Sequence, residues 1–147
     1  MQTIVEPKET IAELFERYTR YLTDGNLDGL ADIYNYPALA VTAIGCQAIT
    51  DPQQTRDFFK QGRAFYLSQG VTGVRASEIT TEIEVPGIWV GHLKLINIDD
   101  AGLAVGEERN AYQIVTLPDG TRRIAVTTPL DAYNPDQKSG VKDWPQD

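Results

Sequence analysis

The chain has a single cysteine, Cys46, and a single histidine, His92, among its 147 residues. One cysteine excludes an internal disulfide and any metal site built from several cysteines. One histidine excludes a multi-histidine metal site within one chain, so we expect no bound metal. We also expect no cofactor. The same scarcity excludes Ser-His-Asp, Cys-His and zinc hydrolysis chemistry, unless His92 alone supplies the base.

Long apolar runs are also missing. The segment from Met1 to Pro7 contains no apolar core of a signal peptide. No apolar run approaches the ~18 residues that a membrane-spanning helix requires. Together with the single cysteine, these features predict a cytoplasmic protein without a membrane partner.

Basic residues are few and scattered. The chain has 13 Lys and Arg against 21 Asp and Glu, a formal net charge of −8, and its only close basic pair is Arg122-Arg123. Phosphate binding depends on clustered Lys and Arg, so a nucleic-acid partner is not expected. An acidic surface also repels anionic membranes.

What is present is an ordinary globular composition, with 41% hydrophobic and 23% charged residues. A chain of this length can build one full core but not two ordinary domains. We therefore predict a single domain over 1–147, with a core of about 7–130. The remainder, 131–147, is rich in Pro, Asp, Gln and Lys, and is predicted to be an irregular tail that Trp144 anchors.

Three segments in the first half of the chain carry apolar residues at helical spacing. The first is predicted to start with Pro7 at its N1 position and to end at Gly25. Asn26 is predicted to cap a short second helix. Asp51 is predicted to cap a third, with Pro52 at N1. The apolar face of the first helix consists of Ile11, Leu14, Phe15, Tyr18 and Leu22.

From Val71 onward, apolar and polar residues alternate with the period of β-strands. Turn signals divide this half into four predicted strands, roughly 71–85, 88–98, 103–117 and 121–130. Consecutive hairpins make an antiparallel meander, and short strands at 38–43 and 46–49 bring the sheet to six. Strands this long predict strong bending through a β-bulge, and a change of phase places one near Ser77-Glu78.

This order of elements, and three stretches of sequence, resemble the nuclear-transport-factor-2-like (NTF2-like) superfamily. The stretches are LFERYTRYLTDGNLDGLADIYNYPALAVT from Leu14 to Thr42, DPQQTRDFFKQG from Asp51, and YQIVTLPDGTRRIAVTT from Tyr112. The superfamily includes steroid Δ-isomerases, scytalone dehydratase and SnoaL-like polyketide cyclases. The resemblance implies an α+β, cone-shaped fold, with three N-terminal helices on the concave face of a curved, mostly antiparallel six-stranded sheet.

The steroid isomerases within this superfamily provide a residue-by-residue comparison. Tyr18 stands seven residues before Gly25 and matches their catalytic tyrosine, and Tyr34 matches the tyrosine that ends their second helix. Thr42 occupies the position of their aspartate base, and their second pocket acid falls near Gln113. The chain thus has both matching tyrosines but neither carboxylate, so steroid isomerisation is not expected.

Turn chemistry predicts which face of the sheet holds the site. The segments before Gly102 and Gly120 suit three-residue loops, which would pair Asp99 with Leu103 and Leu117 with Thr121. This register places the odd-numbered residues of the last three strands on one face, which is the more apolar face. We predict that this face lines the pocket, although a slip of one residue would exchange the faces of a strand.

Six residues are predicted to border one ligand pocket: Tyr18, Tyr34, Trp89, Glu107, Arg109 and Gln113. Glu107 and Arg109 either form an ion pair that holds a polar ligand, or a salt bridge at the rim without a role. Tyr18 and Tyr34 either donate hydrogen bonds to a ligand carbonyl or pack in an aromatic core. Within the pocket wall, Trp89 is interpreted as a packing residue rather than a platform for the ligand. His92 is interpreted as a structural residue, and Cys46 as a small buried hydrophobe.

Two hypotheses about function follow. The first is a non-catalytic protein that binds a small, partly apolar molecule. The alternative is a cofactor-free isomerase, cyclase, dehydratase or hydrolase that uses Tyr18, Glu107 and Arg109. The position of Glu107, inside the pocket beside a tyrosine or at the solvent rim, distinguishes the two.

Assembly can be predicted from the apolar residues of strand 88–98, which occur on both of its faces. The helices can cover only one side of the sheet. The convex patch would then contain Val90, Ile96, Ile98, Ile114, Ile124 and Val126, more than a monomer normally exposes. We therefore predict a homodimer through the convex face, with covering by the tail as the alternative.

Overall fold

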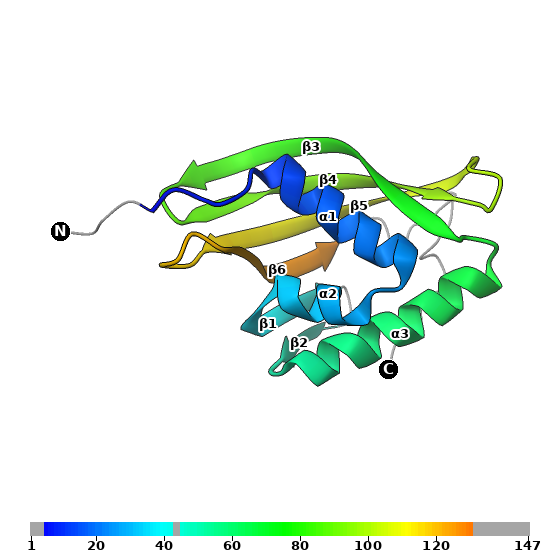
Figure 1. Ribbon diagram of the computed structural model, residues 1–147, viewed down its shortest axis with the longest axis horizontal. Helices are drawn as coiled ribbons and strands as arrows, with labels where there is room; N and C mark the ends of the chain where they lie inside the picture. The colour runs from blue at the N-terminus through cyan, green and yellow to red at the C-terminus, as the bar shows by residue number, and fades with distance from the viewer. Residues whose placement is uncertain (1–4, 43–44, 131–147) are drawn as a thin grey trace.

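The computed structural model describes residues 5–42 and 45–130 (Figure 1). The helices are α1 (Ile11–Asp24), α2 (Leu27–Ile33) and α3 (Pro52–Ser68). The strands are β1 (Tyr34–Thr42), β2 (Gly45–Ile49), β3 (Gly73–Val85), β4 (Ile88–Ile98), β5 (Ala104–Thr116) and β6 (Arg122–Pro129). The predicted α+β class is confirmed, while the predicted tail and Trp144 lie outside the described residues.

The helix ends follow from local capping. Helix α1 begins after Thr10, whose Oγ1 accepts a bond from the Glu13 amide at 3.1 Å while Glu13 Oε1 accepts one from the Thr10 amide at 2.9 Å. The predicted start at Pro7 was therefore wrong, because this reciprocal box satisfies the first free amides of the helix. The predicted end is confirmed, since Gly25 adopts the left-handed conformation with φ of 69°.

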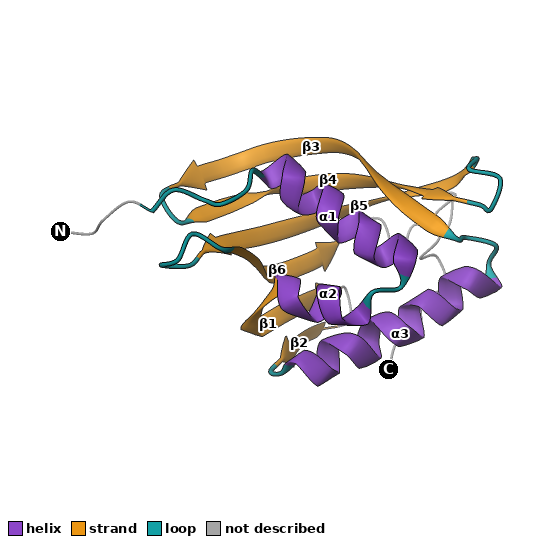
Figure 2. Ribbon diagram, in the orientation of Figure 1, coloured by secondary structure: helices purple, strands orange, loops and turns teal. Residues whose placement is uncertain are grey.

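The sheet has the order β2-β1-β6-β5-β4-β3 (Figure 2). Strands β3 to β6 form the predicted antiparallel meander. Strand β1 pairs in parallel with β6, so the sheet is mixed. The predicted bulge is confirmed, because Ser77 is an extra residue between two β3–β4 pairs, and a second shift occurs at Glu82.

A bulge in β5 changes the predicted register. Both predicted turns form, with the Asp99 amide donating to the Leu103 carbonyl at 3.0 Å and the Leu117 amide to the Thr121 carbonyl at 2.8 Å. However, Ile98 pairs with Ala104 and Asn97 with Gly106, which leaves Val105 as an extra residue. From Gly106 onward, the even residues of β5 therefore share a face with the odd residues of β4.

The β5–β6 ladder contains a second extra residue, Ala125, between the pairs Ile114–Ile124 and Gln113–Val126. The prediction that odd residues of the last three strands share one face was therefore wrong. Ile114 and Ile124, which were predicted on the convex patch, are 1% and 0% exposed and belong to the core.

The core centres on Phe15 of α1, which is fully buried. Its ring lies 5.7 Å from that of Trp89 and 5.1 Å from that of Tyr112. The Trp89 ring covers Gly91, where an added Cβ would lie 2.6 Å from the ring and 2.2 Å from the Thr80 carbonyl. The absence of a side chain at Gly91 thus lets α1 and β4 pack through Trp89.

We expect Phe15→Ala to lower the free energy of unfolding by about 3–5 kcal/mol, because it removes the central aromatic side chain and leaves a cavity. Phe58→Ala is the control, since Phe58 is 39% exposed and should cost less than half as much. Urea unfolding followed by circular dichroism measures both changes. Equal losses in the two variants would contradict this assignment of the core.

Candidate functional site

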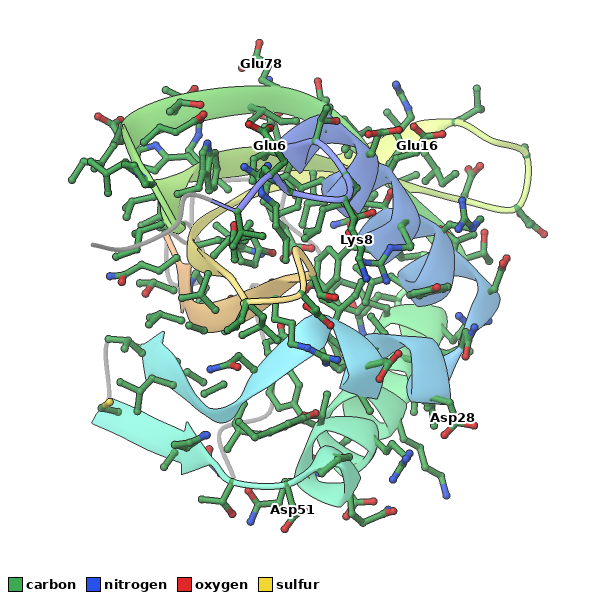
Figure 3. The ribbon with its side chains drawn as sticks, turned by 60° about the vertical axis from the view of Figure 1, so that its left-hand side comes forward. Glu6, Lys8, Glu16, Asp28, Asp51 and Glu78 are labelled. Carbon is green, nitrogen blue, oxygen red and sulfur yellow. The ribbon has the colours of Figure 1, made fainter. Side chains whose placement is uncertain are left out.

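A cavity of about 580 Å³ lies between the helices and the concave side of the sheet. Its wall includes Tyr18 and Leu22 from α1, Leu30 from α2, and Phe59 and Tyr66 from α3. The strands contribute Tyr34, Ala40, Thr42, Gln47, Leu95, Asn97, Glu108, Asn110 and Thr127. Its volume lies within the ~300–1,000 Å³ typical of small-molecule pockets. By contrast, Asp28, Asp51 and Glu78 point away from the body of the protein (Figure 3).

Two of the six predicted residues, Tyr18 and Tyr34, border this cavity. They are 4% and 2% exposed, and both rings contact Phe59, at 6.4 and 5.9 Å between centroids. Tyr18 comes from the buried face of α1, while Tyr34 begins β1 directly after α2. The structure therefore brings these two tyrosines together, and their ligand-binding role stays a prediction.

Trp89 lies in the core and does not line the cavity. Its indole Nε1 donates to Thr81 Oγ1 at 3.0 Å, and its ring packs edge-on against Phe15. Burial by α1 thus leaves Trp89 as a packing residue, and its predicted place in the pocket wall was wrong.

Glu107, Arg109 and Gln113 lie on the convex side of β5, and their predicted positions were wrong because of the bulge at Val105. Glu107 is exposed and pairs across the strands with Lys94, with 3.3 Å between Oε2 and Nζ. Gln113 is also exposed, and Arg109 is half-buried. Glu107 is therefore exposed to solvent outside the cavity, and its salt-bridge partner is Lys94 rather than the expected Arg109.

The same bulge turns Glu108 into the cavity, a residue that the sequence analysis did not select. Glu108 is 6% exposed, and its Oε2 accepts bonds from the Tyr66 hydroxyl at 2.6 Å and from Asn97 Nδ2 at 3.0 Å. Gly106, an isolated glycine inside a predicted strand, is the sequence signal that could have indicated the bulge.

Several buried tyrosine hydroxyls lie in the cavity wall or directly behind it. The Tyr112 hydroxyl lies 3.5 Å from that of Tyr18 and accepts a bond from Asn110 Nδ2 at 3.1 Å. Burial raises the pKa of Tyr18, Tyr34 and Tyr112 above the ordinary value of 10.0. These hydroxyls stay protonated at neutral pH and can donate hydrogen bonds.

Tyr66 and Glu108 lie next to each other in the cavity wall. Burial raises the pKa of Tyr66 well above 10.0, and the neighbouring charge of Glu108 raises it further. Tyr66 therefore remains the donor and the Glu108 carboxylate the acceptor in their hydrogen bond.

Arg63 joins α3 to the end of α1. Its Nη1 donates to the carbonyls of Leu22 and Thr23, each at 2.8 Å, where helix α1 has free acceptors. The guanidinium also passes so close to Gly25 that an added Cβ would lie 2.8 Å from Arg63 Nε. This contact ties α3 to the end of α1 within the cavity wall.

The remaining candidates lie outside the cavity wall. His92 lies on the opposite face of β4 from Trp89, with its Nε2 3.8 Å from Glu82 Oε1. Cys46 is exposed on β2, so its interpretation as a buried hydrophobe was wrong. Among the described residues, no three or more His, Cys, Asp or Glu residues are grouped as metal ligands. In the same part of the chain, none of the helices combines the length and hydropathy of a membrane-spanning segment.

The raised tyrosine pKa values predict a loss of stability at alkaline pH. Because the folded chain keeps these phenolic protons above pH 10 and the unfolded chain releases them, the stability they contribute is complete below pH 10.0 and is lost as the pH rises toward the folded-state values. We expect Tyr18, Tyr34, Tyr66 and Tyr112 to ionise only as the chain unfolds. Tyrosinate absorbance and circular dichroism, followed together against pH, test this. Complete ionisation of all tyrosines near pH 10 with an unchanged dichroism spectrum would contradict it.

Comparison with solved structures shows the same fold at low sequence identity. Rv3472, a protein of unknown function from Mycobacterium tuberculosis, is 14% identical, with a TM-score of 0.63 over 82% of this chain and 68% of that chain. An NTF2-like protein with a cystatin-like fold from Novosphingobium aromaticivorans is also 14% identical, with a TM-score of 0.63 over 81% and 77%. Aln2 from a Streptomyces species is 12% identical, with a TM-score of 0.64 over 82% and 86%.

No curated protein matches the sequence. The family described as NTF2-like protein (DUF6841) matches residues 7–132, which is most of the chain. The resemblance to the NTF2-like superfamily is thereby confirmed, and the protein belongs to this NTF2-like family.

Proposed function

We propose that the chain binds a small, partly apolar molecule in the cavity between the helices and the sheet. The observation that carries the proposal is a space of about 580 Å³ into which buried polar groups converge from an apolar and aromatic wall. Such a combination is typical of ligand sites, where apolar surface supplies affinity and a few polar groups fix orientation.

The residues of the cavity wall would make different contacts with a ligand. Tyr18 and Tyr34, held neutral by burial, would donate hydrogen bonds to a ligand acceptor such as a carbonyl. Leu30 and Phe59 would pack against the apolar part of the ligand.

A cofactor-free enzyme is the second candidate. It is favoured by the presence of a buried carboxylate, Glu108, in the same cavity as neutral tyrosine hydroxyls. A base and a hydrogen-bond donor on one substrate are what proton transfer requires. Thr42 lines the cavity at the position that matches the steroid isomerase base, so Glu108 would act from a different strand.

We expect native mass spectrometry of the purified chain to show a bound small molecule, and Tyr18→Phe to weaken its binding about 2–10-fold through loss of one hydrogen bond. Tyr21→Phe is the matched control, because Tyr21 lies on the same helix but outside the cavity wall. Conversion of the released ligand to a product of different mass, or to an isomer separable by chromatography, would favour the enzyme. Equal affinity in wild type and Tyr18→Phe would contradict the role given to Tyr18.

The proposal includes a homodimer through the convex face of the sheet and no nucleic-acid or membrane partner. With the corrected register, apolar residues from four strands lie on this face: Leu39, Ile83, Val85, Ile88, Val90, Ile96, Ile98 and Val126. All three helices lie on the other side of the sheet (Figure 1). A second copy would remove this apolar surface from water.

Sedimentation equilibrium at micromolar concentration should then give about twice the chain mass of 16.3 kDa. Ile88→Glu should shift the chain toward a monomer, because it introduces a charge into the apolar face. Leu67→Glu on α3 is the matched control, since both side chains are 46% exposed. A monomeric wild type would refute the dimer.

A further inference from the structure

Two carboxamide side chains of the sheet, Asn97 on β4 and Asn110 on β5, belong to the cavity wall. Asn97 Nδ2 donates to Glu108 Oε2 at 3.0 Å, and Asn110 Nδ2 donates to the Tyr112 hydroxyl at 3.1 Å. Within residues 5–42 and 45–130, no donor reaches either amide oxygen. Each carboxamide is thus held by its nitrogen and keeps its oxygen available as an acceptor.

The two amide oxygens are open to the cavity rather than sealed inside the protein. In the part of the chain that the structure describes, the only sealed side-chain nitrogen or oxygen without a hydrogen-bond partner is Arg122 Nε. An unpaired oxygen on a residue of the cavity wall is therefore accessible from the cavity. Asn97 is 2% exposed and Asn110 is half-buried, so Asn110 is the acceptor that a ligand reaches more easily.

The orientation of Asn110 follows from its neighbours. The Tyr112 hydroxyl directs its single proton at the Tyr18 hydroxyl, so it can only accept from Asn110, and the amide nitrogen is the atom that faces it. The oxygen of the planar carboxamide then points away from Tyr112. The residues opposite Asn110 on the two neighbouring strands are Leu93 and Pro129, whose side chains have no hydrogen-bond donor to offer it.

The charges of the wall disfavour an anionic ligand. Among the described residues of the wall, Arg63 is the one basic side chain, and its Nη1 is directed at the carbonyls of Leu22 and Thr23. The acidic side chains Asp57 and Glu108 line the same cavity. A bound carboxylate would therefore lose its hydration and meet negative charge without a free cation to compensate.

We infer that the cavity selects an alcohol or a phenol, an uncharged molecule whose hydroxyl group donates a hydrogen bond to Asn110 Oδ1. This inference rests on the proposed function and specifies the ligand class for it. A ligand without a donor would take water away from the amide oxygen and leave it unpaired, which is more costly than leaving it hydrated. Asn97 Oδ1 presents a second acceptor of the same kind deeper in the wall.

The test uses three probes that share a phenyl ring and a short chain: 2-phenylethanol, its methyl ether and phenylacetate. Isothermal titration calorimetry of the full chain at neutral pH measures each affinity. We expect the alcohol to bind at least about fivefold more tightly than the ether, and phenylacetate to bind most weakly. The extra methyl group of the ether would by itself favour the ether, so a preference for the alcohol reports the hydrogen bond.

Three variants of β5 locate the preference. Asn110→Leu keeps the approximate shape of the side chain and removes its acceptor, so the ether should then bind at least as tightly as the alcohol. Asn110→Asp retains an acceptor oxygen and should retain the preference for the alcohol. Gln113→Leu is the matched control, because Gln113 is an exposed carboxamide on the convex face of the same strand, and it should behave as wild type. Circular dichroism melting curves show whether each variant is folded.

The outcomes separate this inference from the proposed function. If wild type binds the ether or phenylacetate as tightly as the alcohol, the inference is overturned and the pocket remains a binding site. A preference for the alcohol that persists in folded Asn110→Leu, or that is lost in folded Asn110→Asp, would overturn the role of Asn110. Failure of all three probes to bind wild type at millimolar concentration would overturn both the inference and the pocket's proposed function.

Discussion

The extra residue Val105 in β5 is the constraint on which the rest of the structure depends. It shifts the phase of the strand so that Tyr112 faces Phe15 in the core and Glu108 faces the cavity. Without it, the alternation of the strand would turn Glu107 and Arg109 inward instead, and the core would lose Tyr112. Core packing and site chemistry are thus coupled through one backbone irregularity.

The helices form the other side of the cavity, opposite the sheet. Thr10 and Glu13 cap the start of α1, Gly25 ends it, and Arg63 then binds its last carbonyls from α3. These local contacts fix where α1 begins and stops, and they tie α3 to its end. Helix α3 also packs against α2, and the cavity lies between these helices and the sheet.

The two ends of the sheet's concave face differ in the side chains that they carry. Towards Phe15 and Trp89 the space is filled by rings, and Gly91 makes room for the indole. Towards Asn97 and Glu108 the wall carries polar groups that hydrogen-bond one another within an otherwise apolar surface. A buried network of this kind is costly unless its members are satisfied, which explains why Tyr66 and Asn97 both reach the same carboxylate oxygen.

The amino-acid sequence by itself determined the features that depend on neighbours along the chain. The caps at Asn26 and Asp51, the end of α1 at Gly25, and the hairpin turns before Leu103 and Thr121 all follow from local backbone preferences. The order of helices and strands, and with it the family, could also be predicted. Only the tertiary structure decided that Glu108 and not Glu107 enters the cavity, because the bulges at Val105 and Ala125 depend on how neighbouring strands pair across the sheet.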